Sequence, residues 1–207
     1  STPQDINKYE ELLGDGKQIG IKISYRVQQY PEGIAQALII GEDFIGKDDV
    51  CLILGDNIFY GKVIPKLLRG IYSEVEKNNY SIIFGYNVKD PNRYGVIDFD
   101  TNMKVLSLEE KPKNPKSNFA IPGLYIFDSN VVSYVKDLKP SSRGELEITD
   151  LLQKYLKEGA LRVTKMDKGT AWLDTGTFSS LMQASQFVQV LEKRQGLKVG
   201  CIEESAY

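Results

Sequence analysis

In the first half of the chain, uninterrupted apolar runs alternate with segments of helical periodicity. Val50–Leu54 is apolar at every position and Tyr80–Val88 is nearly so, which predicts strands buried on both faces of a parallel sheet. Apolar residues at helical spacing predict a helix over about 63–79 between them. Alternating polarity predicts another strand over about 22–27. This succession of strands and helices predicts a doubly wound α/β sheet.

The pattern changes after residue 88. Three strands, over about 94–99, 105–111 and 119–127, follow one another without a helix between them. They predict an antiparallel extension of the sheet that walls one side of a pocket. A strand over about 161–166 and a long helix over 178–195 then complete the pattern. The whole chain therefore reads as one α/β domain.

The first residues have the signature of a helix start. Thr2-Pro3-Gln4-Asp5 supplies a capping residue, a proline for the first helical position and an acid for the first turn. No strand precedes this helix in the sequence. We therefore expect a βαβ protein whose N-terminal strand or strands are missing.

Composition removes several classes of function. A net charge of −2 and a pI near 5.4 argue against nucleic acid or an anionic membrane as the main partner. No apolar run approaches the roughly 20 residues of a transmembrane helix. The chain has no histidine, which excludes Ser–His and Cys–His catalysis and histidine-bound zinc. Two cysteines without metal spacing fit a reduced, cytoplasmic protein.

Two aspartates close apolar strands beside a glycine, Asp56 after Val50–Leu54 and Asp174 after residues 171–173. Ligands of α/β sheets bind at such strand ends, and Mg²⁺ takes one or two protein carboxylates together with phosphate oxygens. Other readings remain open, because Asp56 could shape a turn and Asp174 could cap a helix. A carboxylate pair could also act as acid and base on a glycoside.

Basic residues lie near the same expected strand ends. Lys111 ends the predicted strand over 105–111 and could meet a phosphate, while the neighbouring Glu110 could accept sugar hydroxyls. Arg143 lies beside a helix start, a reasonable place for a phosphate clamp. A solvated Glu–Lys pair and an exposed arginine are the alternatives. Gly33 precedes a helix and either approaches a ligand through its backbone or forms an ordinary turn.

Six motifs occur in order along nearly the whole chain. They are Leu54–Asn57, Arg93–Val96, Leu108–Pro112, Pro115–Asn118, Arg143–Asp150 and Ala171–Thr177. Together they resemble the bacterial glucose-1-phosphate thymidylyltransferases. The resemblance implies a Rossmann-like, mixed and mostly parallel sheet flanked by helices, with an antiparallel sugar-binding extension. It also implies Mg²⁺-dependent transfer from dTTP to glucose 1-phosphate, which gives dTDP-glucose and pyrophosphate.

The resemblance assigns roles to particular residues and parts of the chain. Asp56 and Asp174 would bind the metal, and Lys111 and Arg143 would hold the sugar phosphate, so that these four form the catalytic set. The nucleotide-binding residues would be Gln28, Pro31 and Gly33. The sugar-binding residues would be Asn57, Gly95, Glu110, Ile121, Gly123 and Tyr125, of which Ile121 replaces a usual valine. Residues 1–88 would form the nucleotide-binding part of the single domain and 89–207 the sugar-phosphate-binding part.

The sequence lacks the family's glycine-rich loop, which cradles the triphosphate, and its helical C-terminal tail. We therefore expect these 207 residues to be inactive alone. The family implies a cytoplasmic homo-oligomer, tetrameric at full length, with dTDP-rhamnose as an inhibitor and no nucleic-acid or membrane partner. The alternatives are a nucleotidyltransferase using UTP or another NTP, a metal-dependent glycosyltransferase and a non-catalytic sugar-nucleotide sensor. The glycosyltransferase is disfavoured because no Asp-x-Asp follows Leu54.

Overall fold

The computed structural model describes residues 1–201 of the chain, which divide into two compact units. One unit contains Ser1–Pro31 and the described residues from Asp174 onward, and the other is Glu32–Leu173. Each unit is described by itself. The functional division at residue 88 stays a prediction.

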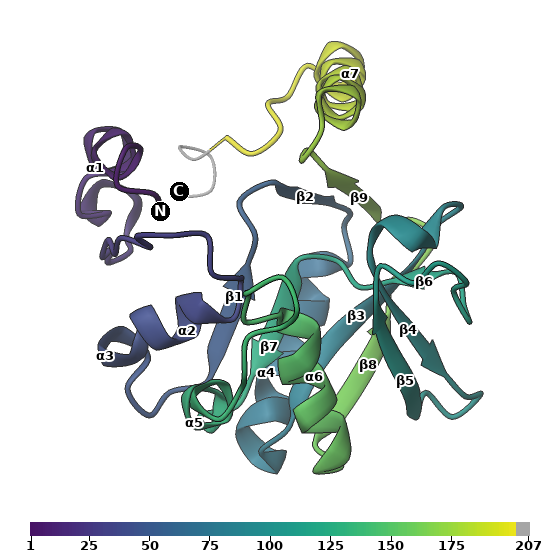
Figure 1. The fold of residues 1–207 in the computed structure, drawn as a ribbon. Coiled ribbons are helices and arrows are strands. Elements are labelled where there is room, and N and C mark those ends of the chain that lie inside the picture. The colour runs from purple at the N-terminus through teal and green to yellow at the C-terminus, as the bar shows by residue number, and fades with distance from the viewer. Residues whose placement is uncertain (202–207) are drawn as a thin grey trace. The chain divides into compact units, whose positions relative to one another are not determined.

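The larger unit is built on a seven-stranded sheet (Figure 1). Its strands are β1 (Val50–Ile53), β3 (Ser81–Asn87), β4 (Gly95–Phe99), β5 (Val105–Glu110), β6 (Phe119–Ala120), β7 (Leu124–Phe127) and β8 (Leu161–Lys165). The order is β1-β7-β3-β6-β4-β5, and β8 also pairs with β3. The predicted hairpin is confirmed as the antiparallel pair β4–β5.

The sheet is mixed, as predicted, but the expectation of mostly parallel pairing is wrong. β3 pairs with β8 in parallel. The pairs β1–β7, β3–β7, β3–β6, β4–β6 and β4–β5 are antiparallel. The alternation of strands and helices correctly predicts that β1 and β3 run in the same direction. It could not predict that β7, which comes about 70 residues after β1, lies between them in the opposite direction.

Helices cover both faces of this sheet. They are α2 (Gln36–Ile40), α3 (Glu42–Ile45), α4 (Ile64–Asn78), α5 (Val131–Lys136) and α6 (Ile148–Lys157), with a short 3₁₀ turn at Pro91–Arg93. Alternate residues of β3 enter different cores: Ile82 and Phe84 pack with α4, whereas Ile83 packs with residues of α5 and α6. Each fully buried side chain of this size contributes about 1.5–3 kcal/mol. The two cores therefore hold the sheet between helical layers.

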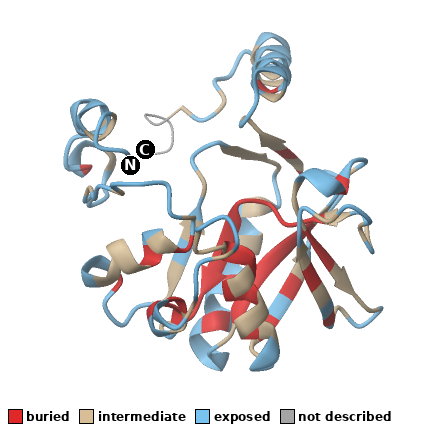
Figure 2. Cartoon of the chain, in the orientation of Figure 1, coloured by how far each residue is buried: buried red, intermediate tan, exposed pale blue. Residues whose placement is uncertain are grey.

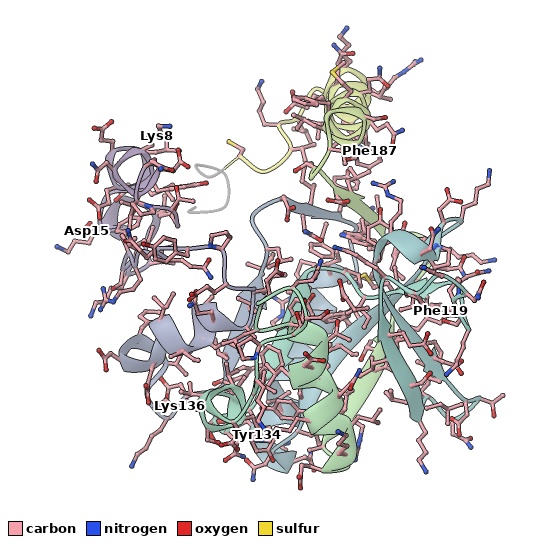
Figure 3. The ribbon with its side chains drawn as sticks, in the orientation of Figure 1. Lys8, Asp15, Phe119, Tyr134, Lys136 and Phe187 are labelled. Atoms are coloured by element: carbon pink, nitrogen blue, oxygen red, sulfur yellow. The ribbon has the colours of Figure 1, made fainter. Side chains whose placement is uncertain are left out.

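Contacts between helices fix the layer formed by α2, α3, α5 and α6. Lys136 of α5 forms an ion pair with Glu42 of α3 at 2.5 Å. Tyr134 of α5 packs on Tyr155 of α6 with their ring centroids 4.8 Å apart. Figure 3 labels Lys136 and Tyr134 on this layer. The Tyr155 hydroxyl donates to buried Asp128 at 2.6 Å, which ties α6 to the end of β7.

Strand β1 is half-buried on one face and exposed on the other, contrary to the expectation for an uninterrupted apolar run. Cys51 is exposed and Ile53 is 55% exposed. Figure 2 colours β1 tan and pale blue, whereas β3 and β7 are largely red. In the described sheet β1 lies at the end of the strand order and pairs with β7 alone. An apolar groove lined by Cys51, Leu68 and Tyr72 runs between β1 and α4.

A second, two-stranded sheet pairs β2 (Asn57–Tyr60) with β9 (Ala171–Asp174). The sequence did not separate β2 from the turn that precedes it. The remaining unit contains α1 (Ile6–Leu13), a 3₁₀ turn at Lys17–Ile19 and α7 (Phe178–Gln195). Residues 22–27 form no strand, so that prediction is wrong.

Candidate active site

Asn57, the first residue of β2, connects three segments through its carboxamide. Its Oδ1 accepts hydrogen bonds from the Gly123 backbone N–H (3.0 Å) and from the Trp172 indole Nε1–H (2.6 Å). Its Nδ2 donates to Asp56 Oδ1 at 2.8 Å. A Cβ at position 123 would lie 2.7 Å from the Leu54 side chain and 2.9 Å from Asn57 Nδ2. Only glycine therefore fits at position 123 without displacing Asn57.

Glu110, the last residue of β5, lies in a second polar group. Its Oε2 accepts a 2.6 Å hydrogen bond from Thr149 Oγ1 in the first turn of α6. Gly95 is its partner across the hairpin, and the Ile121 backbone N–H donates to the Gly95 carbonyl at 2.8 Å. A Cβ on Gly95 would lie 3.4 Å from Glu110 Oε2 and 3.7 Å from Ile121 Cδ1. The absence of a side chain at position 95 therefore leaves the Glu110 carboxylate accessible beside Ile121.

Tyr125 of β7 is influenced by the charges of both polar groups, those of Glu110 and Asp56. The residue is buried, and burial raises the pKa of its phenol, with the charges of Glu110 and Asp56 adding to the increase. Its hydroxyl therefore stays protonated and able to donate. All six predicted sugar-binding residues lie at or next to strand ends of the Glu32–Leu173 unit.

Lys111 follows β5 with a strained backbone. Its φ is +41°, in the left-handed region that non-glycine residues rarely adopt. Its backbone N–H donates to the Tyr94 carbonyl at 3.1 Å, which holds it against the start of β4. Its Nζ lies 3.7 Å from Glu110 Oε1. Strained backbone conformations are concentrated at functional positions. Here the strained residue is the lysine at the end of the β4–β5 hairpin.

Arg143 lies in the loop before α6 and is held by carboxylates. Its Nε and Nη2 donate to Glu147 at 2.8–3.0 Å, and Nη2 lies 3.4 Å from Glu145 Oε2. Glu147 also accepts from Ser141 Oγ at 2.8 Å. Hydrogen bonding to Glu147 raises the pKa of Arg143 most, and the charges of Glu147, Glu145 and Glu110 add to it. The guanidinium thus lies in a negative field that includes the Glu110 carboxylate.

Gly33 has a clear structural role. Its φ is +101°, and a Cβ there would lie 2.3 Å from the Leu146 carbonyl oxygen. The Leu146 N–H donates to Glu32 O, and Leu146 O accepts from the Ala35 N–H. The glycine is therefore required where α2 approaches the loop that carries Arg143. Its predicted contact with the nucleotide stays a prediction.

The other two predicted nucleotide-binding residues, Gln28 and Pro31, belong to the smaller unit. The Gln28 backbone N–H donates to the Ser1 carbonyl at 2.8 Å, which holds this segment beside the N-terminus. Pro31 is the last residue of the unit's first segment.

Of the two predicted metal ligands, Asp56 lies in a turn and Asp174 is the last residue of β9. Asp56 lies between β1 and β2 and accepts from Asn57, and Asp174 Oδ1 accepts from the Gly176 N–H at 2.9 Å. Thr177, not Asp174, caps α7. Within residues 1–201, no group of three or more acidic or cysteine side chains could hold a metal ion. Asp56 belongs to the Glu32–Leu173 unit and Asp174 to the other unit, so their joint role as Mg²⁺ ligands stays a prediction.

Two residues of this site make contacts that the sequence does not predict, Trp172 and Thr149. From the sequence, Trp172 could stack on a base or sugar or belong to the core, and Thr149 has no assigned role. Both lie within motifs that carried the resemblance, Ala171–Thr177 and Arg143–Asp150. That position was the available signal, but a buried tryptophan or threonine is by itself more typical of a core. Their polar contacts with Asn57 and Glu110 became visible only in the structure.

Comparison with known proteins places this geometry in a family. The nucleotidyl transferase family model matches residues 1–190. The chain is 50% identical over all 207 residues to a glucose-1-phosphate thymidylyltransferase of Neisseria gonorrhoeae and spans 71% of that protein. It is 52% identical over the same length to that of Mycolicibacterium smegmatis and spans 70% of it. The chain belongs to the glucose-1-phosphate thymidylyltransferase family.

Solved structures agree with this assignment. A Bacillus anthracis protein assigned as a glucose-1-phosphate thymidylyltransferase, in complex with sucrose, matches with a TM-score of 0.79 and 41% identity. The match covers 90% of this chain and 73% of that one. UDP-glucose pyrophosphorylase complexed with UDP-glucose matches with a TM-score of 0.73 and 25% identity. The mixed α/β fold is thus that of sugar nucleotidyltransferases, and the sequence is more similar to the thymidylyltransferases.

Proposed function

We propose that the protein transfers the thymidylyl group of dTTP to glucose 1-phosphate and releases pyrophosphate. The observation that carries this proposal is the clustering of the predicted sugar-binding residues. Asn57 with Gly123, and Glu110 with Gly95 and Ile121, form two polar groups in one unit. Family membership supplies the identity of the reaction. UTP as the preferred donor is not favoured, because among the solved structures identity is 41% to the thymidylyltransferase and 25% to UDP-glucose pyrophosphorylase.

The sugar would be held by groups of complementary hydrogen-bonding character. Glu110 accepts from sugar hydroxyls, whereas Asn57 and the neutral phenol of Tyr125 donate. Gly95 leaves room for the ring beside Glu110, because it has no side chain there, whereas Gly123 allows Asn57 and Leu54 to pack closely against the backbone.

Charge neutralisation accounts for the chemical step. A phosphate oxygen of glucose 1-phosphate attacks the α-phosphorus of dTTP, and the bond from that phosphorus to the oxygen of the leaving pyrophosphate breaks. Lys111 and Arg143 would orient the attacking phosphate and offset the charge that develops around phosphorus. Asp56 and Asp174 would hold Mg²⁺, which adds positive charge to the phosphate oxygens when bound. No histidine is needed.

The remaining assignments rest on the family resemblance alone. Gln28, Pro31 and Gly33 would contact the thymine side of the nucleotide. The full-length protein would work in the cytoplasm as a homotetramer, with dTDP-rhamnose as an inhibitor. Within residues 1–201, no helix is long and apolar enough to cross a membrane.

Binding and turnover test different parts of this proposal. Isothermal titration of the 207-residue chain with Mg²⁺ should show saturable binding of dTDP-glucose, tighter than that of CDP-glucose or ADP-glucose. The proposed function would be overturned if all three sugar nucleotides bound with equal affinity. It would also be overturned if neither dTDP-glucose nor glucose 1-phosphate showed saturable binding. Chromatographic assay for dTDP-glucose tests the separate prediction that these residues are inactive alone. Product formation would confirm the function and contradict that prediction.

A further inference from the structure

The hydrogen-bonding capacity of Asn57 is almost fully used inside the protein. A carboxamide oxygen has two acceptor positions, and both are taken, one by Gly123 and one by Trp172. Of the two Nδ2 hydrogens, one is donated to Asp56. Within residues 1–201 the other hydrogen has no partner. Asn57 can therefore offer a ligand one N–H donor and no acceptor.

Trp172 is held so that its indole N–H points at Asn57. Its ring contacts those of Tyr86 and Tyr94, with centroid distances of 5.5 and 5.0 Å. The Tyr86 hydroxyl donates to the Thr170 carbonyl at 3.2 Å, which ties the segment before β9 to β3. Because the ring is also buried, its N–H has little freedom to find another acceptor.

The two donors that face Oδ1 permit one orientation of the amide. If the carboxamide rotated by 180°, its NH₂ group would face the N–H groups of Gly123 and Trp172, and both hydrogen bonds would be lost. The Nδ2 donor would also leave the Asp56 carboxylate. Backbone geometry fixes the Gly123 donor, so the Trp172 side chain is the only one of the two that a substitution can remove.

We propose that Trp172 is a positioning residue that sets the orientation of the Asn57 carboxamide. Through it, Asn57 presents a single donor beside Asp56 and selects an acceptor oxygen on the sugar phosphate. The inference rests on the proposed function for the identity of the ligand. The contact between Trp172 and Asn57 is independent of that identity.

A double-mutant cycle tests whether Trp172 acts through Asn57. Trp172→Phe keeps an aromatic ring and removes the N–H, and Asn57→Ala removes the carboxamide. Each should weaken glucose 1-phosphate binding roughly three- to tenfold, as expected for one hydrogen bond. The double variant should bind no more weakly than Asn57→Ala alone. Additive losses would overturn the proposal, because Trp172 would then act independently of Asn57.

A spectroscopic measurement tests the contact without any ligand. The chain has one tryptophan, so its ¹⁵N-correlated NMR spectrum contains one indole N–H signal. In wild type this proton should exchange slowly with solvent, and in Asn57→Ala it should shift and exchange faster. An unchanged signal would overturn the proposal even if glucose 1-phosphate binds. If the sugar phosphate does not bind to wild type, the proposed function fails while this measurement still decides on the contact.

Asn57→Asp separates the orientation of the side chain at position 57 from its ability to donate a hydrogen bond to the ligand. A carboxylate can still accept from both Gly123 and Trp172, so the slowly exchanging indole signal should persist. It offers no donor to the ligand and adds a negative charge beside Asp56. The affinity for glucose 1-phosphate should therefore fall at least as much as it does in Asn57→Ala. Retained binding would show that the donor is not what the ligand uses.

Discussion

The Thr149 hydroxyl donates a 2.6 Å hydrogen bond to Glu110 Oε2. This contact joins the first turn of α6 to the end of β5, and Thr149 is almost fully buried. The other oxygen of Glu110 lies 3.7 Å from the Lys111 ammonium. The hydrogen bond from Thr149 thus orients the Glu110 carboxylate before any ligand arrives.

Removing the Thr149 hydroxyl should weaken sugar binding. Thr149→Val has nearly the same shape but no donor, so Glu110 loses the contact that orients it. We expect glucose 1-phosphate to bind roughly three- to tenfold more weakly and stability to fall by about 1 kcal/mol. Thr149→Ser keeps the hydroxyl and should retain most of the affinity. Titration calorimetry of both variants checks this, and equal affinities would contradict the orienting role.

Replacing Lys111 with glycine should separate stability from binding. Glycine adopts a φ of +41° without strain, so Lys111→Gly should leave the free energy of unfolding unchanged or raise it by up to about 1 kcal/mol. Loss of the ammonium should weaken glucose 1-phosphate binding by at least roughly tenfold. Urea unfolding and calorimetry measure the two effects.

Lys113→Gly is the matched control for that experiment. It removes the same charge three positions from Glu110, at a residue that is exposed and has an ordinary backbone conformation. We expect it to leave binding unchanged and to lower stability slightly. If both variants lost the same affinity, the effect would reflect net charge alone.

Arg143 should not tolerate replacement by lysine. The Glu147 carboxylate engages Nε and Nη2, which leaves Nη1 to reach a phosphate while the ion pair persists. A lysine has a single nitrogen and cannot keep both contacts. Arg143→Lys should therefore weaken glucose 1-phosphate binding by roughly tenfold. Arg162→Lys, at a guanidinium that donates to the carbonyls of Gly159 and Leu161, should bind normally.

Asp49 should make stability depend on pH. Burial raises the pKa of its carboxyl above the usual 3.8, and the charges of Asp128, Glu76 and Asp48 add to this, against a backbone hydrogen bond from Ser129 that lowers it. Because the folded-state pKa is higher than the unfolded one, the carboxyl favours folding below about pH 4, and this contribution is lost as pH rises through the folded value.

The substitution Asp49→Asn tests this sign. The amide cannot ionise, so the variant should melt at a higher temperature than wild type near pH 7, and the difference should shrink toward pH 4. Asp48→Asn removes the same charge at an exposed neighbour and should change the melting temperature much less. A difference between Asp49→Asn and wild type that did not vary with pH would contradict the prediction.

Local signals in the sequence predicted the elements that local chemistry determines. The helix over 178–195 is predicted correctly from its apolar spacing and from Gly196, which ends it with a φ of +69°, although its cap is Thr177 and not Asp174. The hairpin over 94–111 followed from its turn. These features depend on residues a few positions apart, and a sequence shows such neighbours directly.

Features that depend on distant residues were not predictable in the same way. Whether an apolar strand is covered on both faces depends on which strand and helix reach it, and for Cys51 only one face is covered. The need for glycine at position 33 arises from Leu146, more than a hundred positions away. The family resemblance supplied the residues of the site, but Trp172 and Thr149 acquired roles only when their partners could be seen.

The long-range pairing of β3 has a consequence for how the protein is made. Gly85 of β3 aligns with Lys165 of β8, and Ile82 aligns with Ile126 of β7. At about 5–20 residues per second, β3 leaves the ribosome roughly 4–16 seconds before β8 does. During that time the strand on which both cores are built has an unpaired edge. The nascent chain therefore exposes a strand that contributes to both cores for seconds, and this interval is where chaperones would influence the yield of folded protein.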